Sequence, residues 1–207
     1  MTVEDGIAAR VPADDFVPVD VAAAARELVA GLVLRPWGEA SPSVYETGRL
    51  VSLTPWLTGH AERVAYLVRG QRPDGGWGSP GGYALVPTLS ATEALLSTFD
   101  GRTGPAGVST AVDRALRALH RWLRPGTSWS SLDMPAVELI VPALVGRINH
   151  RLDRLGGTPV SGLDAWRGEG RLALPRGMDG RRLGALRHAV AAGAPVPEKL
   201  LHALEVI

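Results

Sequence analysis

Apolar residues recur at every third or fourth position along most of this 207-residue chain. This spacing places them on one face of an α-helix. The first such stretch covers residues 21–33 and follows Asp20, a residue type that caps helices. A second begins at Thr54 and Pro55, which suit the N-cap and first helical position, and runs to Gly70. Further helices are predicted from about 87 to 99, from 109 to 123 and from 135 to 155.

Each predicted helix has an apolar stripe that should face a core. Thr110 and Asp113 resemble a capping box, and Pro142 predicts a kink because it removes a backbone donor inside its helix. The five stripes, in chain order, are Val21, Ala25, Leu28 and Leu32; Leu57, Ala61, Val64 and Val68; Leu89, Thr92, Leu96 and Phe99; Val112, Leu116, Leu119 and Leu123; and Val137, Val141, Leu144, Ile148, Leu152 and Leu155.

The remainder of the chain is a glycine-rich connector, residues 156–180, followed by two helices. The first covers residues 180–193 and ends at Gly193, and the second opens at Pro197. No segment alternates in the way that predicts a strand. The predicted fold class is therefore all-α, with antiparallel helical hairpins packed around a common core.

Composition excludes several classes of function. The net charge is +1, so no charge excess points to nucleic acid or acidic lipid. The chain has no cysteine, which excludes disulfides and thiolate metal sites. Its first residues are acidic and lack an apolar segment, and no apolar run approaches the roughly 20 residues of a membrane span. We therefore expect a cytoplasmic protein that neither spans a membrane nor binds nucleic acid.

The stretch "YLVRGQRPDGGW", residues 66–77, places a glutamine, an aspartate, glycines and a tryptophan in one short turn. A glutamine amide can bond free backbone groups at a helix end, and an indole can stack on its flat face. Asp74 is expected to shape the turn through backbone contacts. The predicted role is structural, since such a turn would join one helical hairpin to its neighbour.

This turn resembles the QW motif of the terpene cyclase superfamily through Tyr66, Leu67, Gln71, Gly75 and Trp77. Three other stretches narrow the resemblance to bacterial class II diterpene cyclases of the copalyl-diphosphate-synthase type. They are "SVYETGRL" from residue 43, in which Glu46 and Gly48 replace the usual Asp and Ala, "DMPAVELIVPALVGRINHRL" from residue 133, and "LRHAVAAGAPVPEKLLHALEVI" from residue 186.

The resemblance implies an αα-barrel (αα-toroid) of the γ-domain type. It implies a flexible leader in residues 1–18 and a helix of a β-type barrel in residues 19–34. The γ-type barrel would cover residues 35–194, and a β-type domain would start in residues 195–207. The implied substrate is geranylgeranyl diphosphate or a similar prenyl diphosphate, with Mg²⁺ bound through the diphosphate.

Class II cyclases protonate an alkene or epoxide with an Asp-x-Asp-Asp acid, and this sequence contains no such motif. The adjacent Asp14 and Asp15 lack its spacing and lie in the leader. We therefore predict no catalytic residue here, and expect either an amino-terminal fragment or one component of a split enzyme. The alternative is a non-catalytic αα-toroid that binds or scaffolds a separate cyclase subunit. Exposed apolar faces on the first and last helices would favour self-association.

Glu138 is the one candidate for the substrate cavity, near a diphosphate-bound magnesium. The alternative is an ordinary surface glutamate that pairs with Arg147 or Arg151. Five tryptophans, namely Trp37, Trp56, Trp122, Trp129 and Trp166, could line an isoprenoid pocket, although core packing is the commoner role. The histidines, His60, His120, His150, His188 and His202, lack metal-ligand spacing. Ser128, Ser130 and Ser131 lack a nucleophile elbow, so no metal site or serine nucleophile is predicted.

Overall fold

The computed structural model describes residues 20–34, 42–79, 81–99, 104–124, 136–155, 163–175 and 178–198, together with residue 200. All regular elements in these ranges are helices, so the all-α prediction is confirmed there. The chain divides into two compact units, Met1–Ser41 and Pro42–Ile207. The predicted domain boundaries at residues 18, 34 and 194 stay predictions.

The first unit contains helix α1, Val21–Leu34. Asp20 caps it as predicted, because its Oδ1 accepts hydrogen bonds from the backbone N–H groups of Ala22 and Ala23, both at 3.0 Å. None of its residues is buried. Leu28 and Leu32 of the predicted stripe are 66% and 55% exposed.

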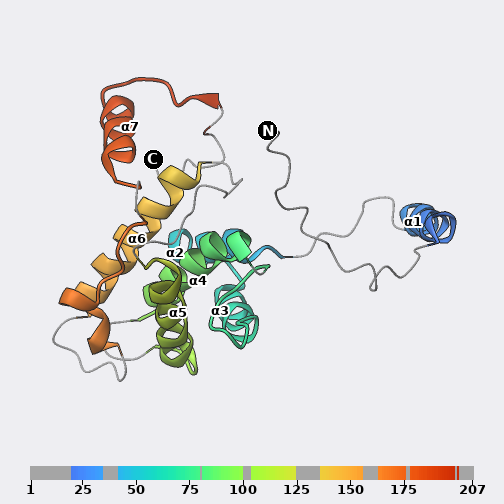
Figure 1. The fold of residues 1–207 in the computed structure, drawn as a ribbon, viewed down its shortest axis with the longest axis horizontal. Coiled ribbons are helices and arrows are strands. Elements are labelled where there is room, and N and C mark those ends of the chain that lie inside the picture. Colours follow the sequence, from blue (N-terminus) through green and yellow to red (C-terminus); the bar gives the residue numbers. More distant parts are fainter. Residues whose placement is uncertain are drawn as a thin grey trace, which may run out of the picture. The chain divides into compact units, whose positions relative to one another are not determined.

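The second unit is built around one buried helix, α4 (Figure 1). Helices α2, α3, α5 and α6 contact α4, and α7 packs on α6. Buried side chains cover the whole circumference of α4, which is why its sequence shows no polar face. The bounds of these helices are α2 Val44–Leu53, α3 His60–Arg69, α4 Leu85–Ser97, α5 Val108–Trp122, α6 Val137–Arg154 and α7 Arg181–Ala191. Short 3₁₀ helices precede α4 (η2, Gly81–Ala84) and α7 (η3, Asp164–Trp166, and η4, Gly168–Gly170).

Most of the predicted inward faces are confirmed. The stripe of α5 from Val112 to Leu123 is buried, as is the stripe of α6 from Val141 to Leu155. Pro142 lies inside α6, and its predicted kink stays a prediction. Gly193 ends α7 with φ +92°, and Ala194 N donates to Ala189 O at 3.0 Å, the bond that closes a Schellman motif. The predicted helix from Pro197 lies largely outside the described residues.

One predicted helix start and one predicted cap are wrong. Thr54 ends α2 instead of opening α3, because its hydroxyl and its backbone N–H both bond Leu50 O, at 2.9 and 3.1 Å. Residues 55–59 form turns, and α3 begins after Gly59. The capping box is also wrong, since α5 begins after Gly107 in a left-handed conformation and Asp113 bonds other side chains. The error at Thr54 arises because a threonine hydroxyl can accept a bond at a helix start or donate one to a carbonyl at its end.

Candidate functional site

The turn between α3 and α4 joins three helices through buried bonds. The Trp77 indole is fully buried and donates from Nε1 to Leu67 O at 2.8 Å. The Trp77 backbone N–H donates to the Thr88 hydroxyl in α4 at 2.9 Å. Gln71 Nε2 donates to Gly75 O at 2.9 Å and to Ala111 O in α5 at 2.8 Å. Its partners are thus a turn carbonyl and a carbonyl in the first turn of α5, instead of free groups at the end of α3.

The other residues of this turn also have structural contacts. Asp74 shapes the turn as expected, with Oδ1 accepting from the Gly76 N–H at 3.0 Å. Its ion pair with Arg72 is the main reason that the pKa of its carboxyl is lowered. A Cβ at Gly75 would lie 2.5 Å from Arg114 O, so the turn can approach α5 only with glycine there. Tyr66 donates its hydroxyl proton to Pro42 O at 2.7 Å. These contacts are the structural role that the sequence predicts for the turn.

A second polar cluster joins α2, α4 and α6 at Glu93, whose side chain is fully buried. Its Oε2 binds Arg49 at 2.7 Å, and its Oε1 accepts from Ser52 at 3.0 Å and from Arg151 at 2.5 Å. Burial raises the pKa of Glu93, but the attraction of Arg49 and Arg151 and the bonds from Arg151 and Ser52 outweigh it, so the net pKa is lowered. The carboxylate is therefore charged and has all its partners within the chain.

The stretch "SVYETGRL" forms most of α2 and supplies Arg49 to this cluster. Gly48 lies where α2 crosses α4, and a Cβ there would stand 2.9 Å from Ser90 O. Ser90 donates its hydroxyl proton to Tyr45 O at 2.8 Å. Glycine in place of alanine at this position therefore allows the close approach of the two helices.

Glu138 lies in a different setting, at the start of α6. It is exposed and lines a cleft of about 340 Å³ with Met178, Asp179, Arg181 and Arg182. The cleft thus has two carboxylates and two guanidinium groups. The alternative pairing of Glu138 with Arg151 is wrong, because Arg151 binds Glu93 and Ser52.

Asp179 and Arg181 of the cleft bind each other. Asp179 Oδ2 binds Arg181 Nε at 2.7 Å, and Oδ1 accepts from the Arg181 backbone N–H at 3.0 Å. The side-chain bond from Arg181 is the main reason that the pKa of Asp179 is lowered. The sequence analysis missed these residues, although the run "MDGRR" before a predicted helix places an acid and two bases at its start.

The remaining candidates are dispersed. Trp56 is 78% exposed, and Trp122 packs against the core. Trp166 donates from Nε1 to Asp113 at 3.0 Å and lies beside His120 and Arg117. Trp37, Trp129 and the serines at positions 128, 130 and 131 lie outside the described residues. No three histidine or acidic side chains gather as a metal site in the part of the chain that the structure describes.

The described helices include none with the length and apolarity needed to cross a membrane. No protein-family model matches the chain. Two similar proteins are a copalyl diphosphate synthase of Streptomyces cyslabdanicus, 42% identical over 87% of this chain, and an ent-copalyl diphosphate synthase of Streptomyces sp. (strain KO-3988), 39% identical over 89%. The aligned part is 34% of each relative. The chain thus spans about a third of the length of the curated relatives that it matches.

A solved structure gives the same result. The ent-copalyl diphosphate synthase from Streptomyces platensis superimposes with a TM-score of 0.70 at 41% identity. The match covers 89% of this chain and 36% of that protein. This match confirms the predicted all-helical fold of the terpene cyclase type. By sequence and by fold, the chain is a homologue of the bacterial copalyl diphosphate synthases, which are class II diterpene cyclases.

Proposed function

We propose that this chain is the γ-domain part of a class II diterpene cyclase that cyclises geranylgeranyl diphosphate to a copalyl-type bicyclic diphosphate. The homology and the polar cleft at Glu138 support this proposal. The reaction adds a proton to the terminal alkene and removes one from the final carbocation, so it is an isomerisation that retains the diphosphate. The acid would come from sequence outside this chain, which has no Asp-x-Asp-Asp motif.

The cleft is the part of the chain suited to the diphosphate end of the substrate. Guanidinium groups bind phosphate oxygens through charge-assisted hydrogen bonds, a role open to Arg181 and Arg182. Carboxylate oxygens are ligands that Mg²⁺ prefers, and Glu138 and Asp179 could supply them. Magnesium would neutralise diphosphate charge there. Glu138 is the better ligand of the two, because both oxygens of Asp179 already accept bonds from Arg181.

A chimera tests the proposal directly. In the Streptomyces platensis enzyme, the matching third would be replaced by this chain, and products from geranylgeranyl diphosphate and Mg²⁺ would be identified by mass spectrometry after phosphatase treatment. We expect a bicyclic alcohol from the chimera and none from the isolated chain. A bicyclic alcohol from the isolated chain above the no-enzyme control would show that it holds its own acid, which contradicts the proposal.

The alternative function is a binding or scaffold partner of a separate cyclase subunit. One observation favours it: helices α2 to α7 share a single buried core, which the second unit forms from its own residues. A chimera that folds and binds pyrophosphate but forms no product would favour this alternative.

A further inference from the structure

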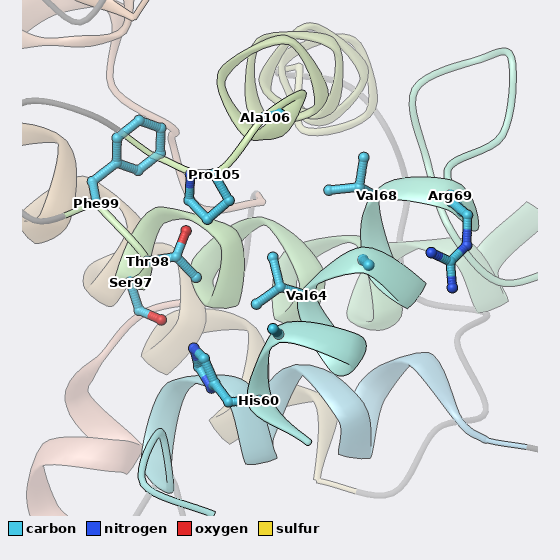
Figure 2. A pocket seen from close by; sticks show the side chains of 11 residues that line it. His60, Val64, Val68, Arg69, Ser97, Thr98, Phe99, Pro105 and Ala106 are labelled. Atoms are coloured by element: carbon cyan, nitrogen blue, oxygen red, sulfur yellow. The ribbon is translucent and has the colours of Figure 1, made fainter. Parts of the chain in front are cut away.

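Helix α5 carries a row of exposed arginines along one side. Arg114, Arg117 and Arg121 recur at positions i, i+3 and i+7, a spacing that places them on one face over about 10 Å. Arg124 follows directly after the C-cap of the helix. All four are exposed, and we call them the arginine face. The row lies outside the groove of about 580 Å³ between α3 and the α4–α5 connection, whose described lining includes no residue of α5 (Figure 2).

The fold holds two of these guanidinium groups in place. Arg114 Nη2 donates to Arg72 O at 2.7 Å and to Pro73 O at 3.2 Å. Arg121 Nη2 donates to Asp74 O at 3.0 Å. A guanidinium has five N–H donors, so each of the two keeps donors that bind nothing in the part of the chain that the structure describes. Because folding has already ordered these side chains, a ligand that binds them loses less side-chain entropy.

Two carboxylates of the described residues lie beside the arginine face, and each has its own cation. Asp113, the one carboxylate of α5, accepts from Arg117 Nε at 2.9 Å. Asp74 in the turn before α4 pairs with Arg72. The other three arginines of the face form no ion pair with any described residue. Their positive charge is therefore not neutralised by this part of the fold.

The adjoining residues outside the described ranges do not reverse this charge. By sequence, residues 100–103 and 125–135 hold two aspartates and one arginine, a net charge of −1 against three guanidinium groups. Such groups bind carboxylates and phosphates through charge-assisted hydrogen bonds. Affinity for a nucleic acid rests on many phosphate contacts and a strongly basic surface, whereas the net charge of this chain is only +1. A short acidic protein segment therefore fits the arginine face better.

We propose that the arginine face binds an acidic helical segment of a partner protein. Carboxylates at positions i, i+3 or i+4 and i+7 of that segment lie on one side of its helix, at the same intervals as the arginines of α5. Arg114 and Arg121 bind these carboxylates through the donors that the turn leaves available, and Arg124 extends the contact. The face lies on α5, whereas Glu138 lies on α6, so the proposal does not depend on the cyclase function.

Fluorescence polarisation with a labelled peptide tests the proposal on the full chain. The peptide is alanine-based, about 20 residues long so that it can form a helix, and has glutamates along one side. We expect saturable binding that weakens as salt is raised. Combining Arg114→Gln with Arg121→Gln should weaken it by about tenfold. Combining Arg69→Gln with Arg154→Gln is the matched control, because it removes two exposed arginines from α3 and α6 and should bind as the native chain does.

Two further measurements separate a binding role from a structural one. Arg124 is exposed and forms no hydrogen bond with the described residues, so Arg124→Gln should weaken peptide binding by about threefold and leave the thermal midpoint unchanged. A peptide of the same composition with its glutamates spread around the helix should bind more weakly.

Several results would overturn the proposal. They are the absence of saturable binding, an equal loss in the two double variants, unchanged affinity of Arg124→Gln, and equal affinity for the two peptides. Tighter binding of a single-stranded oligonucleotide than of the peptide would also overturn it, since the partner would then be a nucleic acid.

Discussion

Glu93 and Glu138 lie on adjacent core helices, and each has two arginines nearby, yet the two sites differ in every property that decides a role. Glu93 is fully buried, and its oxygens bind Arg49, Arg151 and Ser52. Glu138 is exposed in an open cleft beside Arg181 and Arg182. A carboxylate whose partners all belong to the fold stabilises the fold, whereas one that faces solvent beside cations remains available to a ligand. Burial and partners, not residue type, therefore separate the structural acid Glu93 from the candidate site residue Glu138.

Removing the buried carboxylate should have the largest effect. Glu93→Leu leaves Arg49 buried without its partner, so we expect the free energy of unfolding to fall by about 3–5 kcal/mol. Urea denaturation followed by circular dichroism measures the change. Because a well-packed apolar pair can replace a buried ion pair, Arg49→Met combined with Glu93→Leu should regain much of the loss. If Glu93→Leu alone keeps the native midpoint, the ion cluster does not hold the helices together.

Acid should weaken the same cluster. The folded-state pKa of Glu93 is lowered, because the attraction of Arg49 and Arg151 outweighs burial, which would raise it. A lowered pKa gives stability that is present above the unfolded-state pKa and lost as the pH falls through the folded-state pKa. We therefore expect the native chain to lose stability below the ordinary range of a glutamate. In thermal melts between pH 3 and pH 7, the melting temperature of Glu93→Gln should fall less on acidification than that of the native chain. If both fall by the same amount, Glu93 does not cause the acid sensitivity.

The turn before α4 has a structural role, as Glu93 does. Trp77→Ala should lower the free energy of unfolding by on the order of 3 kcal/mol, because it removes a fully buried indole and its bond to Leu67 O. Trp56→Ala is the matched control, since Trp56 is 78% exposed and its loss should cost under about 0.5 kcal/mol. Equal denaturation midpoints for the two variants would show that the turn contributes no packing energy.

Gln71 should contribute less than Trp77. Gln71→Ala removes two hydrogen bonds to carbonyl oxygens, and we expect a loss of about 1–2 kcal/mol in urea denaturation. Gln71→Met retains most of the side-chain volume but neither bond, so it should lose a similar amount. A Met variant as stable as the native chain would assign the effect to packing instead of hydrogen bonding.

The sequence predicted α5 and α6 well because the burial of these two helices is periodic. The stripes of α5 and α6 follow directly from that period, and Asp20 and Gly193 mark helix ends by their own chemistry. Thr54 could not be assigned, because the same residue types occur at helix starts and at helix ends. The confusion moved the predicted start of α3 by five residues, and its predicted inward face is only partly right: Val64 is buried, but Leu57 and Ala61 are exposed, and the fully buried residue of α3 is Leu67.

The polar sites were harder to predict, because they join residues that are far apart in the chain. Arg49, Glu93 and Arg151 meet only when α2, α4 and α6 pack. A signal was nevertheless present, since a glutamate in the otherwise apolar "TLSATEALL" needs buried partners. Glu138 was identified by resemblance, but Asp179, Arg181 and Arg182 become its neighbours only through the contact of α7 with α6. The assignment of the QW motif and a role for Glu138 in the cyclase stay predictions.

Substitution of Glu138 should have the smallest effect on stability. It tests whether Glu138, unlike Glu93, is available to a ligand. Because Glu138 is exposed, Glu138→Gln should change the free energy of unfolding by less than about 0.5 kcal/mol. The same variant should weaken the binding of inorganic pyrophosphate in the presence of Mg²⁺, by about tenfold for the loss of one charged ligand, and should leave binding without Mg²⁺ unchanged or tighter. Arg182→Gln should weaken binding under both conditions, because a guanidinium binds phosphate oxygens directly. Calorimetric titrations with and without Mg²⁺ distinguish the two roles. If Glu138→Gln binds magnesium pyrophosphate as tightly as the native chain while Arg182→Gln does not, the cleft binds the anion but Glu138 is not a ligand of the metal.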